Sequence, residues 1–386
     1  MERTHIRLNP ARMGIGGELL QEQLRSLIVG QDEAIRSIVD VYQTHLTGLS
    51  VPGRPIGSLL FLGPTGSGKT RIVEATAECL LGNSRAILKI DCGEFQHSHE
   101  IAKLIGSPPG YMGHRDTRAL LSQEALDQYF TPTSQIAFVL FDEIEKASDA
   151  LWNLLLGILD KATLTLGDNR KVDFSQAMIF LTSNLGASEM AALLNPRIGF
   201  AAQLGPDALA GGLDKKISRT AEAAARRKFT PEFINRLDKI VSFKPLGEKQ
   251  LRQILDIELR MVQERIFTAG PRRSFVFNAT GRVKEMLLRE GTDVKYGARH
   301  LKRAIERLLV QPISNLMATA QARPGDSIRI DLEPSSSRLT FVRDAEGLPF
   351  RALTHMAGRG IPAAAAAVAS SAAPEQVRTW KSTFFK

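Results

Sequence analysis

Residues 58–70 read SLLFLGPTGSGKT. The apolar run from Ser58 to Leu62 predicts a buried β-strand, and the residues after it match the pattern G-x-x-x-x-G-K-[ST]. Because this pattern lies between a predicted strand and a helical pattern, it indicates a phosphate-binding loop and disfavours a Gly-rich turn that binds nothing. The loop consists of Gly63, Pro64, Thr65, Gly66, Ser67, Gly68, Lys69 and Thr70.

The residue types of this loop predict how it binds a nucleotide. Glycines let backbone N–H groups converge on phosphate oxygens, and the N-terminus of the following helix adds a favourable dipole. Lys69 is expected to reach the β- and γ-phosphates, and the hydroxyl of Thr70 is expected to ligate Mg²⁺. ATP and Mg²⁺ are therefore the expected cofactors.

A second apolar run ends in two carboxylates. Residues 137–143 read AFVLFDE, which predicts a strand that ends at Asp142 and Glu143. At the carboxyl end of a parallel strand both side chains can face the nucleotide, where Asp142 would hold the Mg²⁺ shell and Glu143 would polarise the attacking water. A solvated acidic turn is the alternative, which the phosphate-loop pattern upstream disfavours.

Apolar runs and helical patterns alternate along much of the chain after a helical lead-in at 19–49. This alternation predicts an α/β sandwich with helices on both faces of a parallel sheet. After Pro245 the pattern changes to amphipathic helices at 248–267, 281–290 and 298–320, which predicts a smaller α+β domain. The expected strands are 58–62, 86–90, 137–141, 177–181 and 239–243 in the first domain, and 274–277, 327–332 and 338–342 in the second.

The composition fits two packed domains. The chain has 386 residues, of which 43% are hydrophobic and 24% charged, so a disordered chain is excluded. The net charge of +9 is concentrated in residues 241–310 and in an Ala-rich segment after Leu353, which we expect to be a flexible basic tail. The two cysteines, Cys79 and Cys92, lack the spacing of a zinc or redox pair. Together with the lack of an apolar leader or membrane-spanning stretch, this predicts a cytoplasmic protein with no membrane association.

Further motifs accompany the phosphate loop and the paired carboxylates. They are VGQDEA (29–34), GSPPGYMG (106–113), DEIEKA (142–147), TSNLG (182–186), PEFINRLD (231–238) and YGAR (296–299). From about Leu24 to Val342 the chain resembles the AAA+ ATPases, and more narrowly the Clp-type unfoldases, in particular the C-terminal ATPase module of ClpA, ClpB and ClpC. The resemblance implies a P-loop AAA+ helix–sheet–helix ATPase domain with a smaller C-terminal α+β lid domain.

The resemblance and the composition together divide the chain into four parts. They are an N-terminal extension at 1–18, a large ATPase domain at 19–244, a small lid domain at 245–345 and a flexible Ala-rich basic tail at 346–386. The resemblance also implies a ring of six identical copies, which is the assembly of the family. In such a ring an arginine supplied by one subunit to the next makes hydrolysis depend on assembly.

The resemblance assigns nucleotide-site roles to five residues. Ile28 and Val29 would line the adenine pocket, and Asn184 would act as sensor 1 beside the γ-phosphate. Arg236 would be the finger that reaches a neighbouring subunit's ATP, and Arg299 would be sensor 2 on the small domain. Taken singly, an Asn at a strand end is usually a turn residue and such arginines are usually solvated or ion-paired, so these roles depend on the resemblance.

The segment at 106–113 places an aromatic and a flexible apolar residue between glycines. By the resemblance, this loop lines the central pore of the ring, where Tyr111 and Met112 would grip an unfolded polypeptide. A structural β-turn with Tyr111 packed on its own domain is the alternative. A second loop at 167–171 resembles the lower pore loop of the family, while HRDTR at 114–118 departs from the family by making the pore collar more basic.

A short apolar segment resembles the tripeptide with which protease-coupled Clp ATPases dock on ClpP. It consists of Ile198, Gly199 and Phe200, within a Gly-, Ala- and Pro-rich stretch. An exposed apolar tripeptide is a plausible docking anchor, and local packing of Ile198 and Phe200 is the alternative. The sequence thus leaves a ClpP-type peptidase partner open.

Two function classes compete for this chain. The first is an ATP-dependent protein unfoldase or remodelling chaperone that threads polypeptide, alone or with a peptidase. The second is an AAA+ motor acting on nucleic acid, suggested by the net charge of +9 and the basic small domain. The second is disfavoured because aromatic residues make up only 6% of the chain and no aromatic–basic stacking surface stands out.

Overall fold

The computed structural model describes residues 9–106, 119–132, 134–194, 206–270, 273–291, 298–333 and 338–357. These residues divide into two compact units. The first comprises the described part of Met1–Leu251 and Asp293–Ala298, and the second comprises that of Arg252–Thr292 and Arg299–Lys386. In the described ranges, no helix combines the length and the apolar character that crossing a bilayer requires.

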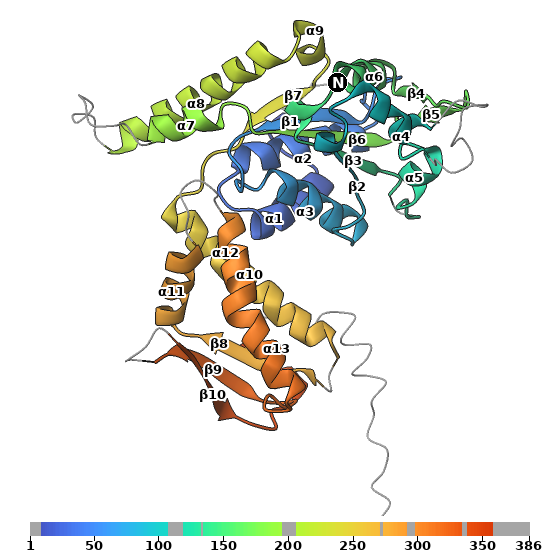
Figure 1. Ribbon diagram of the computed structural model, residues 1–386. Helices are drawn as coiled ribbons and strands as arrows, with labels where there is room; N and C mark the ends of the chain where they lie inside the picture. Colours follow the sequence, from blue (N-terminus) through green and yellow to red (C-terminus); the bar gives the residue numbers. More distant parts are fainter. Residues whose placement is uncertain are drawn as a thin grey trace, which may run out of the picture. The chain divides into compact units, whose positions relative to one another are not determined.

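A five-stranded parallel sheet forms the centre of the first unit, with the order β2-β3-β6-β1-β7 (Figure 1). Its strands are β1 (Gly57–Leu62), β2 (Leu88–Asp91), β3 (Ala137–Asp142), β6 (Ala177–Ser183) and β7 (Lys239–Ser242). All five predicted strands are confirmed, with bounds that differ by up to two residues. The three central strands, β1, β3 and β6, are buried almost throughout because both faces of the sheet are covered, which explains their continuous apolar runs.

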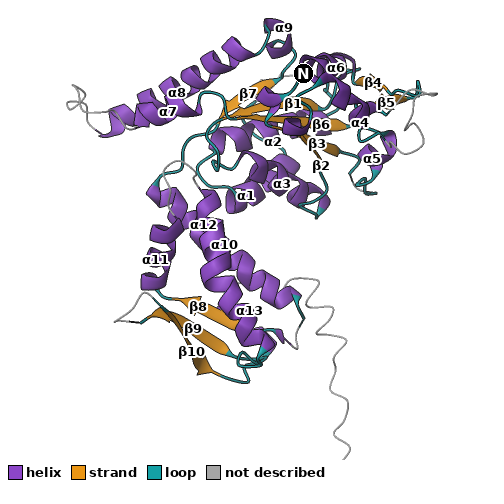
Figure 2. Ribbon diagram, viewed as in Figure 1, coloured by secondary structure: helices purple, strands orange, loops and turns teal. Residues whose placement is uncertain are grey.

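Alternate residues of the central strands enter two different cores. In β3, Phe138 and Leu140 join the core beneath one face, while Val139 and Phe141 join the core beneath the other. Helices α1 (Ile15–Leu27), α2 (Asp32–Leu46) and α3 (Lys69–Leu81) cover the first face. Helices α6 (Asp149–Lys161), α8 (Pro206–Lys228) and α9 (Pro231–Ile234) lie on the opposite face, so the predicted helix–sheet–helix sandwich is confirmed (Figure 2).

Three aromatic residues anchor the helices of the second face. The ring centroid of Trp152 on α6 lies 4.8 Å from that of Phe229 and 5.6 Å from that of Phe233, and the two Phe rings are 5.4 Å apart. Such tilted ring pairs add about 0.5–1.5 kcal/mol each to the free energy gained by burial. The cluster therefore fixes the segment that leads into the 231–238 motif.

Short elements fill the connections of the first unit. The antiparallel hairpin of β4 (Thr163–Thr165) and β5 (Lys171–Asp173) was not predicted, because each strand is only three residues long. The loop at 167–171 runs from the turn of this hairpin into β5. The remaining short elements are η1 (Cys92–Glu94), η2 (Ser98–Ile101), α4 (Ala102–Ile105), α5 (Gln123–Asp127), η3 (Ile144–Lys146) and α7 (Ala187–Leu194).

The second unit is the predicted smaller α+β domain. Its sheet has the order β10-β9-β8 and pairs β8 (Val276–Ala279) parallel to β9 (Ser327–Leu332), which is antiparallel to β10 (Leu339–Ala345). Strand β8 begins two residues after the predicted start. Its longer helices are α10 (Glu248–Thr268), which begins in the first unit, and α11 (Gly281–Gly291).

The helix predicted at 298–320 is not one regular helix. It consists of α12 (Ala298–Ile305), a π-helical turn, η5 (Glu306–Val310), and α13 (Gln311–Ala318). Pro312 lies in the first turn of α13 and has no backbone N–H to donate to the preceding turn. The regular α-helical bonding pattern is therefore interrupted immediately before it.

The described part of the second unit extends beyond residue 345, although the tail was predicted to begin at residue 346. Helix α14 (Phe350–Met356) contributes Leu353, which is buried, and the ring of Phe350 lies 5.7 Å from that of Phe267. These two anchors give the segment enough apolar contact to fold. The Ala-rich stretch from 358 onwards lies outside the described residues.

Candidate nucleotide-binding and hydrolysis site

The phosphate loop leaves the carboxyl end of β1 through a backbone shape that requires glycine. Gly63 has φ 153°, and a Cβ at this position would lie 2.7 Å from the carbonyl oxygen of Phe243. Its N–H donates to the carbonyl of Ser183 at 3.2 Å, which fastens the loop to the end of β6. The loop is therefore held between the carboxyl ends of β6 and β7.

Lys69 is buried in this loop. Its Nζ donates to the carbonyls of Gly63 at 2.7 Å and Pro64 at 3.0 Å and to Oδ1 of Asn184 at 2.9 Å. The loop therefore holds a positive charge at the N-terminus of α3, where the helix dipole also favours an anion. Ser67 Oγ is buried with no hydrogen-bond partner among the described residues, which suits a loop shaped for phosphate oxygens.

The two carboxylates after β3 are organised by Thr182 of β6. The hydroxyl of this buried residue donates to Oδ1 of Asp142 and accepts the N–H of Glu143 at 3.1 Å. Glu143 has φ 58°, a left-handed conformation that is strained for a residue with a side chain. Thr182 thus fixes both the carboxylate of Asp142 and the turn that presents Glu143.

Asn184 connects the phosphate loop with Glu143. Its Oδ1 accepts from Lys69 Nζ and from Thr65 Oγ1 at 3.3 Å, while its Nδ2 donates to Oε1 of Glu143 at 3.3 Å. Its backbone N–H donates to Glu145 Oε1 at 3.0 Å. The structure therefore brings Lys69, Glu143 and Asn184 together in one network, as the order of their motifs suggested.

Two opposing influences act on the pKa of Asp142. Burial favours the neutral carboxyl, but hydrogen bonds from Lys89 and Thr182 and the charges of Lys89 and Lys69 favour the carboxylate. The net result is a pKa below its ordinary value, so Asp142 is ionised at neutral pH. Beneath it, burial and then the adjacent carboxylates raise the pKa of the Cys92 thiol, which is therefore neutral.

The donor set suits Mg²⁺. Asp142 supplies an ionised carboxylate, and Thr70, the second residue of α3, supplies a hydroxyl. Oxygen ligands of this kind, supplemented by phosphate oxygens and water, are those that Mg²⁺ prefers. Asp142 and Thr70 are therefore the residues that would hold the metal.

Gln31 joins the α1–α2 turn to the phosphate loop, a role that the sequence analysis did not assign. Its Nε2 donates to the carbonyls of Ser67 at 3.1 Å and Lys244 at 2.9 Å, and its Oε1 accepts the N–H of Lys244 at 3.1 Å. The turn also contains Ile28, which is buried in the core below the sheet, and Val29, which is partly exposed. Their role in an adenine pocket stays a prediction.

Arg236 does not lie at the phosphate loop of its own chain. Its carbonyl accepts from Ser58 Oγ at 3.3 Å, at the amino end of β1, whereas the phosphate loop follows the carboxyl end of that strand. Its guanidinium pairs with Glu232 at 3.0 Å and with Asp160 at 3.8 Å. In the single chain it is therefore an ion-paired arginine.

Other predicted site residues fall elsewhere. Arg299 is the second residue of α12 in the second unit, and its role as sensor 2 stays a prediction. Tyr111 and Met112, and the segment 198–200, lie outside the described residues.

The site also contains side chains to which the sequence analysis gave no role. Thr182 and Gln31 lie inside motifs that were quoted, so the motifs themselves were the available signal. Lys89 pairs with Asp142 at 2.8 Å, and Lys146 pairs with Glu143. Lys146 also belongs to a quoted motif, whereas nothing local in the sequence singles out Lys89.

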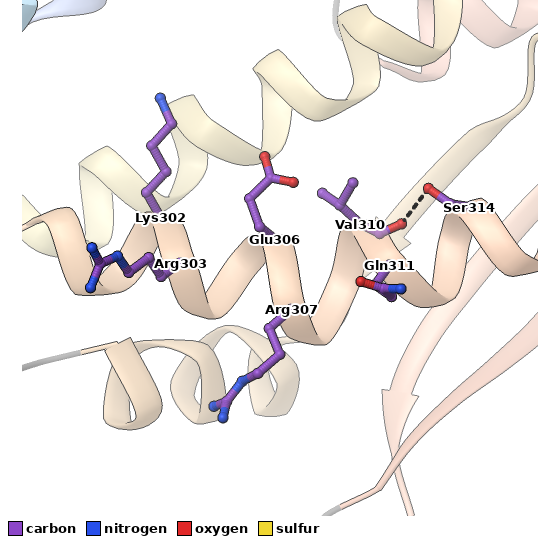
Figure 3. A pocket seen from close by; sticks show the side chains of 7 residues that line it. All are labelled: Lys302, Arg303, Glu306, Arg307, Val310, Gln311 and Ser314. Atoms are coloured by element: carbon purple, nitrogen blue, oxygen red, sulfur yellow. Dashed lines mark hydrogen bonds between the residues drawn. The ribbon is translucent and has the colours of Figure 1, made fainter.

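A hollow of about 470 Å³ occurs in the second unit, along α12, η5 and α13 (Figure 3). Three of its four charged lining residues pair with neighbouring helices: Lys302 with Glu258, Glu306 with Arg265 and Arg307 with Glu290. Figure 3 shows Lys302 and Glu306 pointing to one side and Arg307 to the other. Because these charges are neutralised in pairs, the hollow does not resemble a phosphate site.

A parallel sheet with a phosphate loop after β1 and paired carboxylates after β3 defines the P-loop ATPases. A family model described as the AAA domain (Cdc48 subfamily) matches residues 54–240, and a model of the C-terminal D2-small domain of ClpB protein matches residues 246–330. The chain belongs to the Clp-type AAA+ ATPases.

Relatives and solved structures agree with this assignment. The chain is 35% identical to the chaperone protein ClpB of Bdellovibrio bacteriovorus over 83% of its length, and 37% identical to chloroplastic ClpC3 of Oryza sativa over 86%. Both matches cover 34% of the relative, so the chain spans about a third of the length of these relatives. A Saccharomyces cerevisiae Hsp104:casein complex in an extended conformation superposes with a TM-score of 0.69 at 27% identity, covering 86% of this chain and 53% of that one.

Proposed function

We propose that the chain hydrolyses ATP with Mg²⁺. In this proposal Lys69 binds the phosphates, Asn184 positions the γ-phosphate and the attacking water, and Glu143 accepts the proton of that water. The bound metal would neutralise charge on the phosphates. The network that joins these three side chains through Asn184 supports the proposal.

The position of Arg236 is the observation that supports the second part of the proposal, a site shared between copies of the chain. The six residues of β1 separate it from the phosphate loop, and at about 3.3 Å per residue they span about 20 Å. An arginine side chain is too short to cross that distance, so Arg236 reaches a nucleotide only in another copy of the chain. A contact of this kind is head-to-tail and closes by rotation into a ring, for which we propose six copies.

Assembly-dependent hydrolysis is tested with Arg236→Ala. The variant is expected to bind ATP with unchanged affinity and to lose nearly all hydrolysis, because arginine fingers contribute about 10³–10⁵ in rate. Glu143→Gln, which binds but cannot hydrolyse ATP, is expected to elute as a hexamer in ATP. A monomeric Glu143→Gln protein, or a fully active Arg236→Ala protein, would contradict the ring.

The ring is proposed to thread unfolded polypeptide through its centre, with Tyr111 and Met112 as the gripping residues and Arg299 coupling nucleotide state to the second unit. Support comes from the glycine-flanked aromatic loop and from Hsp104, which was solved with casein. Casein is expected to stimulate ATP hydrolysis, and Tyr111→Ala is expected to lose that stimulation while keeping its basal rate. Stimulation by DNA instead of casein would favour a nucleic-acid motor.

A ClpP-type peptidase is proposed as a partner through Ile198, Gly199 and Phe200. Relatives of the chain include both ClpB chaperones and a Brassica napus protein named as the ATP-binding subunit ClpA homolog of an ATP-dependent Clp protease. Phe200→Ala is expected to abolish co-purification with ClpP without changing ATP hydrolysis. The two free cysteines, Cys79 and Cys92, support a reducing compartment, and we propose the cytoplasm.

A further inference from the structure

Both carboxylate oxygens of Asp142 are engaged by protein groups. Oδ1 accepts the hydroxyl of Thr182, and Oδ2 forms an ion pair with Lys89 Nζ at 2.8 Å. A metal that binds this carboxylate must therefore replace one of these two partners or share an oxygen with it. The two partners differ in how easily they can be replaced.

Strand register explains why Lys89 reaches Asp142. Lys89 of the edge strand β2 lies opposite Leu140 of β3, and Asp91 lies opposite Asp142. Since residues two apart on a strand share a face, Lys89 and Asp142 are diagonal neighbours on the same face of the sheet, about 7–8 Å apart at their Cα atoms. The four-carbon stem of lysine spans this separation along the strand direction.

Thr182 is the fixed partner and Lys89 the exchangeable one. Thr182 is 1% exposed and also holds the backbone N–H of Glu143, so its departure would disturb two groups. The side chain of Lys89 is 49% exposed, whereas that of Asp142 is 20% exposed. A lysine whose side chain is already about half exposed leaves an ion pair at little cost in free energy.

We infer that Lys89 is a placeholder cation for the metal site: it neutralises Asp142 Oδ2 in the empty site and withdraws into solvent when Mg²⁺ arrives with the nucleotide. The inference rests on the proposed Mg²⁺-dependent hydrolysis. Lys89 is thereby a positioning residue that holds Oδ2 of Asp142 in place. Its charge competes with the metal for the same oxygen.

The competition has a measurable consequence. Removing the positive charge frees Oδ2 and removes repulsion between the ammonium and Mg²⁺, so Lys89→Met is expected to bind Mg²⁺ more tightly. We expect the Mg²⁺ concentration that half-saturates nucleotide binding to fall about twofold to fivefold, within the range given by a partly exposed ion pair. Lys89→Arg, which keeps the charge, is expected to stay within about twofold of the wild type.

The test is a Mg²⁺ titration of the binding of a fluorescent, non-hydrolysable ATP analogue to the whole chain. Lys239→Met is the matched control, because Lys239 is an exposed strand lysine at the opposite, amino end of the same sheet, next to Leu59 of β1. Lys89→Gln, with an unfolding curve for each variant, replaces Lys89→Met if the methionine variant does not fold. The wild-type titration establishes first whether the metal site of the proposed function exists.

A lower half-saturation for Lys89→Met, with Lys89→Arg and Lys239→Met unchanged, supports the placeholder. An unchanged or higher half-saturation for Lys89→Met and Lys89→Gln, in a wild type that requires Mg²⁺, overturns it and leaves the metal site intact. A wild type that binds the analogue equally well in EDTA overturns the metal site itself, and the inference with it. The two failures are thus distinguishable.

Discussion

Thr182→Val tests whether one buried hydroxyl organises the hydrolysis site. Valine has nearly the shape of threonine but cannot donate to Asp142 or accept from Glu143. Both bonds are therefore lost with little change in packing. The substitution separates the hydrogen bonds of Thr182 from its volume.

The expected loss of stability follows from the two bonds. A bond between neutral groups contributes about 1 kcal/mol and one to a charged group about 1.5–3 kcal/mol, which gives a range of about 2.5–4 kcal/mol. Because the side chain of Asp142 keeps 20% exposure to water, we expect the lower end, about 2.5 kcal/mol. The loss of the bond to the N–H of Glu143 also frees the strained turn, and a misplaced Glu143 is expected to lower kcat at least tenfold.

Thr76→Val is the matched control. Thr76 is equally buried, but its hydroxyl donates only to the carbonyl of Ile72 one turn earlier in α3, at 2.7 Å. That carbonyl belongs to the helix ladder, so we expect a change below about 1 kcal/mol and an unchanged kcat. Urea unfolding and steady-state ATP hydrolysis are measured for both variants. If Thr182→Val matches Thr76→Val in both measurements, the reasoning about Thr182 is refuted.

Three further predictions concern charge, thiols and backbone shape. Because the pKa of Asp142 is lowered in the folded chain, its contribution to stability is present above the ordinary aspartate pKa of about 3.9 and is lost as pH falls through the lower folded value. Urea unfolding between pH 3 and 6 should therefore show a flatter pH dependence for Asp142→Asn, and an unchanged slope would contradict the pairing. Burial raises the pKa of Cys79 to about 11 and raises that of Cys92 further. Iodoacetamide at about pH 8 should therefore label neither thiol until urea is added. Rapid labelling of the native chain would show that the thiols are accessible. Gly63→Ala places a Cβ 2.7 Å from the carbonyl oxygen of Phe243, at a residue whose φ is positive. The substitution should destabilise the chain by about 1–3 kcal/mol and weaken ATP binding, both measured by calorimetry. A variant with wild-type stability would mean that the loop relaxes freely.

The sequence predicts the large sheet well because its signals are local. Each central strand is a continuous apolar run, since helices cover both faces, and the glycines around Lys69 mark the loop after β1. The β4–β5 hairpin escaped prediction because three-residue strands carry too little alternation. The sequence predicted one continuous helix at 298–320 because Pro312 does not by itself mark a break. A proline is compatible with the first turn of a helix, and its effect here depends on packing.

The site was predictable to the extent that its residues lie in motifs. Lys69, Glu143 and Asn184 were found from the sequence and do converge. Lys89 was not, because its pairing with Asp142 arises from the register between β2 and β3, and register is a property of the sheet and not of either segment. The distance between Arg236 and the phosphate loop likewise appears only once β1 is seen to separate them.

The most direct test of the central claim is a mixing experiment with two inactive variants. Lys69→Ala cannot bind ATP but keeps its Arg236, while Arg236→Ala keeps an intact phosphate loop but has no finger. If one chain completes the site of the next, mixed rings contain interfaces in which a Lys69→Ala subunit supplies Arg236 to the intact phosphate loop of an Arg236→Ala subunit, and ATP hydrolysis reappears on mixing. If the mixture hydrolyses no more ATP than the two variants apart, although both assemble together, Arg236 does not act between copies and the account of a shared site is wrong.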